Sequence, residues 1–381
     1  MKRVYLDNAA TTPLRKEVAT RMLEILNYNF GNPSSTHSYG RESKALVENC
    51  RKKIATFFKV KSSEIVFTSG GTEADNLILR SAVRDLGVEE IITSKIEHHA
   101  VLHTVESLQD EFEISVKFVD LNSDGHVNLK HLEQLLNTDK KQLLTLMHVN
   151  NEIGNKLDIL KVAKMCKSHN ALFHSDTVQS VGHYHLDLTE IPIDFIVASA
   201  HKFHGPKGVG FAFIRKDSGI KASVFGGEQE RGYRAGTEAI HNIVGMTEAL
   251  QIAYDNLDKE SLYIQELKAY FIEGLKTIFT KAEFNGACEN SDDSTYTLIN
   301  VRLPIASEKA SMLQFQLDLK GVACSRGSAC QSGSHQNSHV LTEILNEEDL
   351  SDPSIRFSFS IFNTKEDIDY ALGVLREIAK D

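Results

Sequence analysis

The chain has 381 residues, of which 41% are hydrophobic and 25% are charged, a composition typical of soluble globular proteins and a length that favours two domains. Its formal net charge of −10 argues against nucleic acid as a direct partner, because phosphate binding needs a basic surface. The absence of a membrane-length apolar run, of a signal-peptide core and of zinc-type spacing among the five cysteines predicts a cytoplasmic protein without a membrane segment or a metal centre.

Short apolar strands alternate with helices through the first two thirds of the chain. We expect strands at 64–68, 90–93, 115–119, 143–147, 171–174, 194–197 and 209–214, and helices at 72–84, from about 100, 129–136 and 159–168. This alternation is typical of a mostly parallel sheet covered by helices on both faces.

The pattern changes after about residue 250. We expect a long helix over 259–281, strands at 296–301, 321–323 and 355–359, a helix over 308–319 and a last helix near the C-terminus. These elements predict a second, smaller α+β domain.

A glycine-rich turn, Ser69-Gly70-Gly71-Thr72, joins the first expected strand to the helix that follows it. Backbone N–H groups and the positive end of a helix at such a turn suit a phosphate group. The alternative is structural, because Thr72 and Asp75 have the spacing of a capping box.

Histidines follow two of the expected strands. His98 comes shortly after the strand at 90–93 and could stack its ring on a flat cofactor. His99 and His103 have the i, i+4 spacing of a helical metal site, but the glutamate of the zinc motif HExxH is missing. His183 and His185 alternate as strand residues do and are expected at the surface.

Polar side chains also end two later strands. Asn151 follows the strand at 143–147, and Asp176 ends the strand at 171–174. Ligands of open α/β sheets bind at the carboxyl ends of strands. A carboxylate there could keep a pyridine nitrogen protonated, although Asp176 could equally cap a following helix.

Lys202 lies in the short turn between two apolar strands, flanked by Ser199 and His201. A lysine in this position is unusual, because a buried ammonium group is costly unless it is paired or neutralised. A neutral amine is what Schiff-base formation with the aldehyde of pyridoxal phosphate (PLP) requires. Taken alone, Lys202 could be a surface residue in a hairpin turn; together with a strand-end aspartate it favours a PLP site.

The C-terminal part holds two further candidates. Cys330 lies in a segment rich in glycine and serine, where a thiol is a plausible nucleophile, although it could be an incidental free thiol. Cys324 follows apolar residues and is expected to be a core thiol at a strand end. Arg356 stands between apolar neighbours and needs an anion, either an amino-acid carboxylate or an internal salt-bridge partner.

Taken together, these motifs resemble the class V aminotransferase family, in the branch of cysteine desulfurases similar to the NifS and IscS proteins. The matching segments occur in order along nearly the whole chain: 5–13, 31–35, 70–75, 97–98, 150–154, 176–179, 199–202, 231–237, 327–330 and 354–358. The resemblance implies the PLP-dependent transferase fold type I. It also implies a large α/β domain over 14–250 and a smaller domain formed by 1–13 and 251–381, which carries the cysteine segment.

The resemblance also implies a role for each site residue. Lys202 would bind PLP covalently, Asp176 would pair with the pyridine nitrogen, and His98 would stack on the ring as a catalytic residue. The other cofactor contacts would come from Gly71, Thr72, Ser199 and His201 around the phosphate, Asn151 and Gln179 at the ring hydroxyl, and Thr237 from the partner subunit of a homodimer. Asn32 and Arg356 would bind the substrate carboxylate, and Cys330 would receive sulfur.

The implied activity is conversion of L-cysteine to L-alanine, with sulfur held on Cys330 as a persulfide for an acceptor protein in iron–sulfur cluster assembly or thiolation. The identity of that acceptor stays open. The segment departs from the family pattern, because Arg326 replaces a serine and Cys324 lies six residues before Cys330. Alternatives are a selenocysteine lyase, an ordinary aminotransferase of the same fold, or a PLP-bound regulatory protein without turnover.

Overall fold

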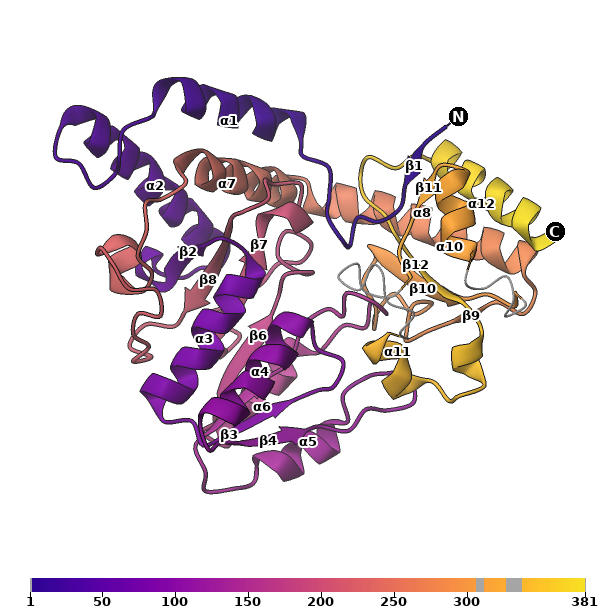
Figure 1. Ribbon diagram of the computed structural model, residues 1–381, viewed down its shortest axis with the longest axis horizontal. Coiled ribbons are helices and arrows are strands. Elements are labelled where there is room, and N and C mark those ends of the chain that lie inside the picture. The colour runs from indigo at the N-terminus through magenta and orange to yellow at the C-terminus, as the bar shows by residue number, and fades with distance from the viewer. Residues whose placement is uncertain (1, 306–311, 327–337, 381) are drawn as a thin grey trace.

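A seven-stranded sheet forms the centre of the larger part of the molecule (Figure 1). The computed structural model describes residues 2–305, 312–326 and 338–380. The strands lie in the order β2 (Ile65–Thr68), β8 (Gly210–Ile214), β7 (Phe195–Ser199), β6 (Leu172–Asp176), β5 (Gln142–Thr145), β3 (Glu90–Thr93) and β4 (Ser115–Phe118). The predicted α/β class with a mainly parallel mixed sheet is therefore confirmed.

The sheet is parallel from β4 to β7, and β8 runs antiparallel to both of its neighbours. All five residues of β7 are buried, as are all five of β8, so these strands read as continuous apolar runs. The connection between β7 and β8 contains a short 3₁₀ helix, Ala200–Lys202. Lys202 therefore lies between two buried strands, as the sequence predicts.

Helices cover both faces of this sheet, and the strand residues alternate between the two. Phe67, Phe173 and Phe213 belong to a core shared with α1 (Lys16–Tyr28), α2 (Ser38–Phe57), α5 (Leu129–Leu136), α6 (Ile159–Ser168) and α7 (Ile240–Asp255). Val66 and Phe195 belong to the opposite core, under α3 (Gly71–Leu86) and α4 (His99–Glu111). The period of two along each strand thus sends neighbouring side chains into different cores.

The C-terminal elements gather beside this part, on the right of Figure 1. An antiparallel sheet of β12 (Ser354–Ser358), β10 (Leu298–Arg302) and β9 (Glu283–Phe284) packs with α8 (Leu257–Ile278), α10 (Leu313–Leu319) and α12 (Lys365–Lys380). Val340 and Leu341 of α11 (His339–Ile344) form a separate small cluster with Ile96 and Ile153. Strand β1 (Val4–Tyr5) pairs in parallel with β11 (Val322–Ala323). Val4 and Leu6 share a core with buried side chains of the C-terminal elements, from Ile264 of α8 to Ile378 of α12. We propose that this core defines the smaller domain, with the first residues of the chain included in it.

The sequence pattern predicts no helix before residue 64, whereas the structure has α1 and α2 there. Both are amphipathic, with exposed charged faces, and they pack against α7. The helix expected over 308–319 is seen as α10, and residues 308–311 lie outside the described residues. Within the described ranges, no helix is long and apolar enough to cross a membrane.

A buried lysine joins α8 to the segment before β10. Lys268 is 5% exposed, and its Nζ donates to Ser294 Oγ at 3.0 Å and to the Thr295 carbonyl at 2.7 Å. It lines a cavity of about 390 Å³ that contains none of the predicted site residues. Burial lowers the pKa of Lys268 to about 8.

This depressed pKa predicts a pH-dependent stability difference. In the unfolded chain this lysine has a pKa of about 10.4, so from about pH 8 upward the unfolded state binds more protons than the folded state. The free energy of unfolding therefore rises with pH, because the folded protein no longer has to bury a charged ammonium group. Relative to Lys268→Met, the wild-type free energy of unfolding should rise by about 2 kcal/mol between about pH 7.5 and about pH 9.5, measured by urea denaturation. The exposed Lys281, changed to methionine, is the control; a wild-type-to-K268M difference that stays constant with pH would contradict the prediction.

Candidate active site

Most of the predicted site residues meet in one cavity of about 220 Å³. The cavity lies where Asp176 ends β6, Ser199 ends β7 and Gly71 begins α3. The predicted residues that line it are Gly71, Thr72, His98, Asn151, Asp176, Gln179, Ser199, His201, Lys202 and Arg356. Because they come from segments up to 285 residues apart (71 and 356), only the folded chain brings them together.

The turn before α3 forms one end of the cavity. An added Cβ at Gly71 would lie 2.6 Å from Val178 Cγ2, so only glycine fits this close approach. The N-terminus of α3 faces the same space as Ser199 and His201, and burial lowers the pKa of His201 to about 4. A neutral histidine, a serine hydroxyl and helix N–H groups are suitable donors for a phosphate.

The capping-box interpretation of this turn is wrong. The N-cap position is Gly70, and the Ser69 N–H donates to Glu73 Oε2 at 2.8 Å. Asp75 is instead a buried residue of the cavity lining, 1% exposed, with its Oδ1 3.3 Å from Nε2 of His174. Burial raises the pKa of Asp75 well above its usual range and lowers that of His174 to about 3. The sequence pattern did not reveal this buried pairing.

Asp176 supplies the negative group of the cavity. It is 5% exposed, and its Oδ1 accepts the N–H of Val178 at 2.9 Å. It initiates a turn, and no helix begins there, so the helix-cap alternative is wrong. Burial raises the pKa of Asp176, against the opposing influence of His98, the Val178 N–H and Lys202. A cationic group bound in the cavity would offset this burial cost.

His98 is the N-cap residue of α4, and its Nδ1 accepts the Ala100 N–H at 3.1 Å. Burial lowers the pKa of His98, although Asp176 opposes the shift. The ring is therefore neutral, with its proton on Nε2. The preceding Glu97 is buried, accepts from Ser94 Oγ at 2.9 Å and from the Met147 N–H at 3.1 Å, and has its pKa raised to about 8 by burial. These contacts fix the turn that presents His98 to the cavity.

Lys202 reaches across the cavity to the first residues of the chain. Its Nζ donates to the carbonyl oxygens of Ala9 at 2.6 Å and Ala10 at 2.9 Å. Gln179 Nε2 donates to the same Ala9 carbonyl at 3.0 Å. The segment around Ala9 therefore forms one wall of the site, a contact for which the sequence analysis had assigned no role.

His183 corrects another expectation. The ring is partly buried, its Nε2 lies 3.1 Å from the Lys202 carbonyl oxygen, and its Nδ1 lies 3.2 Å from Tyr296 Oη. It supports the turn that carries Lys202 and does not lie at the surface. His185 is exposed, as expected.

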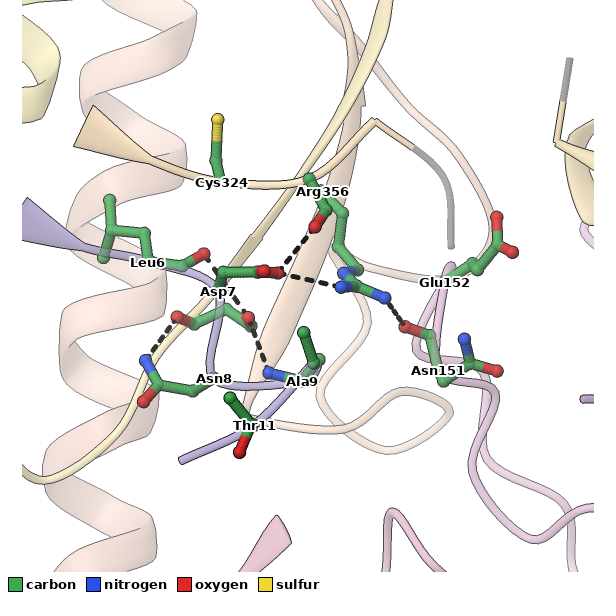
Figure 2. Close-up of polar contacts among 12 residues, drawn as sticks. Leu6, Asp7, Asn8, Ala9, Thr11, Asn151, Glu152, Cys324 and Arg356 are labelled. Carbon is green, nitrogen blue, oxygen red and sulfur yellow. Dashed lines mark hydrogen bonds and ion pairs between the residues drawn. The ribbon is translucent and has the colours of Figure 1, made fainter. Parts of the chain in front are cut away.

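Arg356 makes the internal salt bridge, one of the two contacts that the sequence left open (Figure 2). It is 1% exposed and lines the cavity. Its Nη2 pairs with Asp7 Oδ1 at 2.9 Å, and its Nη1 donates to the Asn151 carbonyl at 2.8 Å. An internal salt bridge therefore exists, and the same guanidinium group faces the space where a ligand would bind.

Two predicted residues do not line this cavity, and a third lies outside the described residues. Asn32 is exposed, and its Oδ1 accepts the Ser34 N–H at 2.9 Å. Thr237 is also exposed and lies outside the cavity lining. Cys330 lies outside the described residues. The roles assigned to these three residues stay predictions.

Cys324 is a core thiol, as predicted. It is 8% exposed, follows β11 and belongs to the core of the C-terminal part. Burial, and then the nearby Asp7 carboxylate, raise the pKa of the Cys324 thiol. A thiol that resists ionisation is a poor nucleophile.

The histidines at i, i+4 spacing are stacked, with the ring centroids of His99 and His103 4.7 Å apart. Among the described residues, no group of three or more His, Cys, Asp or Glu side chains could hold a metal ion.

Comparison with known proteins identifies the relationship. The family described as aminotransferase class-V matches residues 4–371. The cysteine desulfurase IscS of Dictyoglomus turgidum is 42% identical over 381 residues, which cover 99% of this chain and 95% of that protein. A solved NifS-like protein has a TM-score of 0.91 at 35% identity, with 100% of both chains covered. The structure described as SspA in complex with cysteine has a TM-score of 0.81 at 28% identity, covering 95% of this chain and 100% of that one.

The fold and cavity thus define an α/β protein of the PLP-dependent fold type I. The chain belongs to the aminotransferase class-V family. Membership of this family implies dependence on PLP.

The residues of the cavity fit that cofactor. A buried carboxyl at Asp176 would pair with a protonated pyridine nitrogen, and the α3 N-terminus would accept the phosphate at the other end of the cavity. The Lys202 amine lies within the same cavity, where an aldehyde could reach it. The charges and hydrogen-bonding groups of the cavity therefore suit this cofactor.

Proposed function

We propose that this protein is a PLP-dependent cysteine desulfurase, which converts L-cysteine to L-alanine and transfers the sulfur to Cys330 as a persulfide. The observation that carries the proposal is the meeting of Asp176, Lys202 and Arg356 in one cavity. These residues are a carboxylate for a pyridine nitrogen, an amine for an aldehyde and a guanidinium for a substrate carboxylate. The full-length similarity to IscS and the cysteine complex of SspA support the same substrate.

Each residue has a chemical task in this proposal. PLP, when bound, supplies an electron sink for the substrate α-carbon. Gly71, Thr72, Ser199 and His201 would hold the phosphate, Asn151 and Gln179 the ring hydroxyl, and His98 one face of the ring. Lys202 takes the proton from the substrate Cα and returns a proton during product formation. Arg356 holds the substrate carboxylate.

The sulfur step balances without an added oxidant. The Cys330 thiolate attacks the substrate Sγ, the substrate Cβ–Sγ bond breaks, and a new S–S bond forms on Cys330. The electron pair of the broken bond stays with the substrate carbon, which is protonated to give L-alanine. A following reductant or acceptor thiol then removes the outer sulfur.

The test is incubation of the yellow holoprotein with L-cysteine and a thiol reductant, with L-alanine and sulfide measured together. Equal amounts of the two products support the proposal. An aminotransferase would instead need a keto acid and release no sulfide, and a selenocysteine lyase would act on selenocysteine in strong preference to L-cysteine. A regulatory PLP protein would give neither product.

We further propose a homodimer in the cytoplasm that delivers sulfur to an acceptor protein of iron–sulfur assembly or thiolation. Thr237 is exposed on its own chain, which agrees with a role at the phosphate of a partner subunit. The described cysteines, Cys50, Cys166, Cys288 and Cys324, are all unbridged and buried, which suits a reducing compartment.

The dimer gives a direct prediction. Light scattering of the PLP-loaded protein at micromolar concentration should give twice the chain mass of 42.5 kDa. Thr237→Ala should stay dimeric and bind PLP less tightly, because it removes one phosphate contact. A monomer with full PLP occupancy would refute the shared site.

A further inference from the structure

Asp7 occupies an unusual position between two parts of the site. It follows β1, and its Oδ1 accepts from Arg356 Nη2 at 2.9 Å and from Ser325 Oγ at 2.8 Å (Figure 2). Ser325 and Arg356 also exchange two backbone hydrogen bonds, at 2.8 and 3.2 Å. One carboxylate oxygen therefore joins the side chains of two segments that already pair through their backbones.

The guanidinium of Arg356 is held from two sides. Asn151 accepts from Nη1 through its carbonyl oxygen, and Asp7 accepts from Nη2, while Nε is buried without a hydrogen-bond partner among the described residues. A buried guanidinium without a counter-ion would be strongly unfavourable. Asp7 therefore neutralises Arg356 when no ligand is bound, and together with Asn151 it fixes the plane of the guanidinium.

The turn that begins at Asp7 also reaches the other side of the cavity. The Ala10 N–H donates to the Asp7 carbonyl at 3.0 Å, which closes a turn whose Ala9 and Ala10 carbonyls accept from Lys202 Nζ. The residue that orients Arg356 thus belongs to the same turn that contacts the lysine.

We propose that Asp7 is a positioning residue that presents the remaining Arg356 donors to the carboxylate of an α-amino-acid ligand. The identity of the substrate rests on the proposed function, whereas the contact between Arg356 and a carboxylate applies to any α-amino acid. Without the Asp7 carboxylate, the guanidinium of Arg356 keeps only its hydrogen bond to the Asn151 carbonyl. The Arg356 side chain then samples more rotamers in the free protein, and the loss of this freedom when the ligand binds weakens the affinity.

The experiment uses a matched pair of ligands on the PLP-loaded protein: L-alanine and ethylamine, which differ only in the carboxylate. Binding is followed by the change in the visible spectrum. Asp7→Ala should weaken L-alanine binding about tenfold and leave ethylamine binding within about twofold. KM for L-cysteine should rise by a similar factor, with a much smaller change in kcat.

Two further variants distinguish loss of the acceptor for Arg356 from a general disturbance of the structure. Asp7→Asn keeps an oxygen acceptor at the same place and should bind L-alanine within about threefold of wild type. Ser325→Ala removes the second partner of Asp7 but not its contact with Arg356, and should leave L-alanine binding unchanged. If Asp7→Ala does not fold, Asp7→Ser, whose hydroxyl is too short to reach Arg356, carries the same expectation.

Equal loss of both ligands in Asp7→Ala, unchanged L-alanine binding, or failure of Asp7→Asn to restore it would each overturn the positioning role. A wild-type protein that binds L-alanine but forms no alanine from L-cysteine would overturn the proposed function and leave the role of Asp7 intact.

Discussion

Changing Lys202 to alanine is expected to abolish turnover and to remove the visible absorption band after dialysis. In the proposed function, Lys202 would provide both the amine that holds the cofactor aldehyde and the base that moves the Cα proton, so one change removes covalent attachment and proton transfer together. We expect alanine production to fall by at least about a thousandfold. The measurements are the spectrum of the dialysed protein and single-turnover alanine formation.

Lys207 provides the matched control for that experiment. It is exposed, five residues further along the same turn, and does not line the cavity. Lys207→Ala should therefore stay yellow and active. If the wild-type protein is colourless and cannot be reconstituted with PLP, the proposed function fails altogether.

Changing Cys330 to alanine should separate binding from chemistry. In the proposed function, cofactor attachment would use Lys202 and amino-acid binding would use Arg356, and neither step needs the thiol. Cys330→Ala should therefore stay yellow and still change its spectrum with L-cysteine, while alanine formation falls by at least about a hundredfold. Mass spectrometry of the wild type after one turnover should show one added sulfur atom, which the variant lacks.

Cys324→Ala is the comparison variant. Cys324 is buried beside β11 with its thiol pKa raised, so it should not act as the first nucleophile. Its replacement should leave the first turnover unchanged, at a small cost in stability from the lost core volume. Normal turnover in Cys330→Ala combined with loss in Cys324→Ala would transfer the nucleophile role to Cys324.

The fold was predictable from the sequence where local pattern decides structure. The run Phe195–Ser199 is apolar up to its last residue and the run Gly210–Ile214 has no polar side chain, and both form fully buried strands. Helices α5 and α6 begin and end at the residues expected, 129–136 and 159–168, and the N-cap side chains of Asn128 and Asp158 accept backbone N–H groups of their first turns. In contrast, α1 and α2 escaped prediction, since much of their surface is polar and their buried faces become apparent only against α7.

The candidate site was predictable as a set of residue types. A strand-end aspartate, a lysine between buried strands and a glycine turn before a helix each require a particular local structure, and that requirement is visible in the chain. The resemblance to a known family added the order of the motifs and the residues at the ring and the phosphate.

The tertiary structure decided how these groups act on one another. Asp7 and Arg356 are 349 residues apart in sequence, yet they form the ion pair that orients the guanidinium. The buried contact between Asp75 and His174 and the Ala9 and Ala10 carbonyls at Lys202 are equally invisible in the sequence. The physical reason is that sequence fixes the chemistry and local conformation of each residue, whereas burial and distance, which set its charge and its partners, depend on segments that meet only when the chain folds.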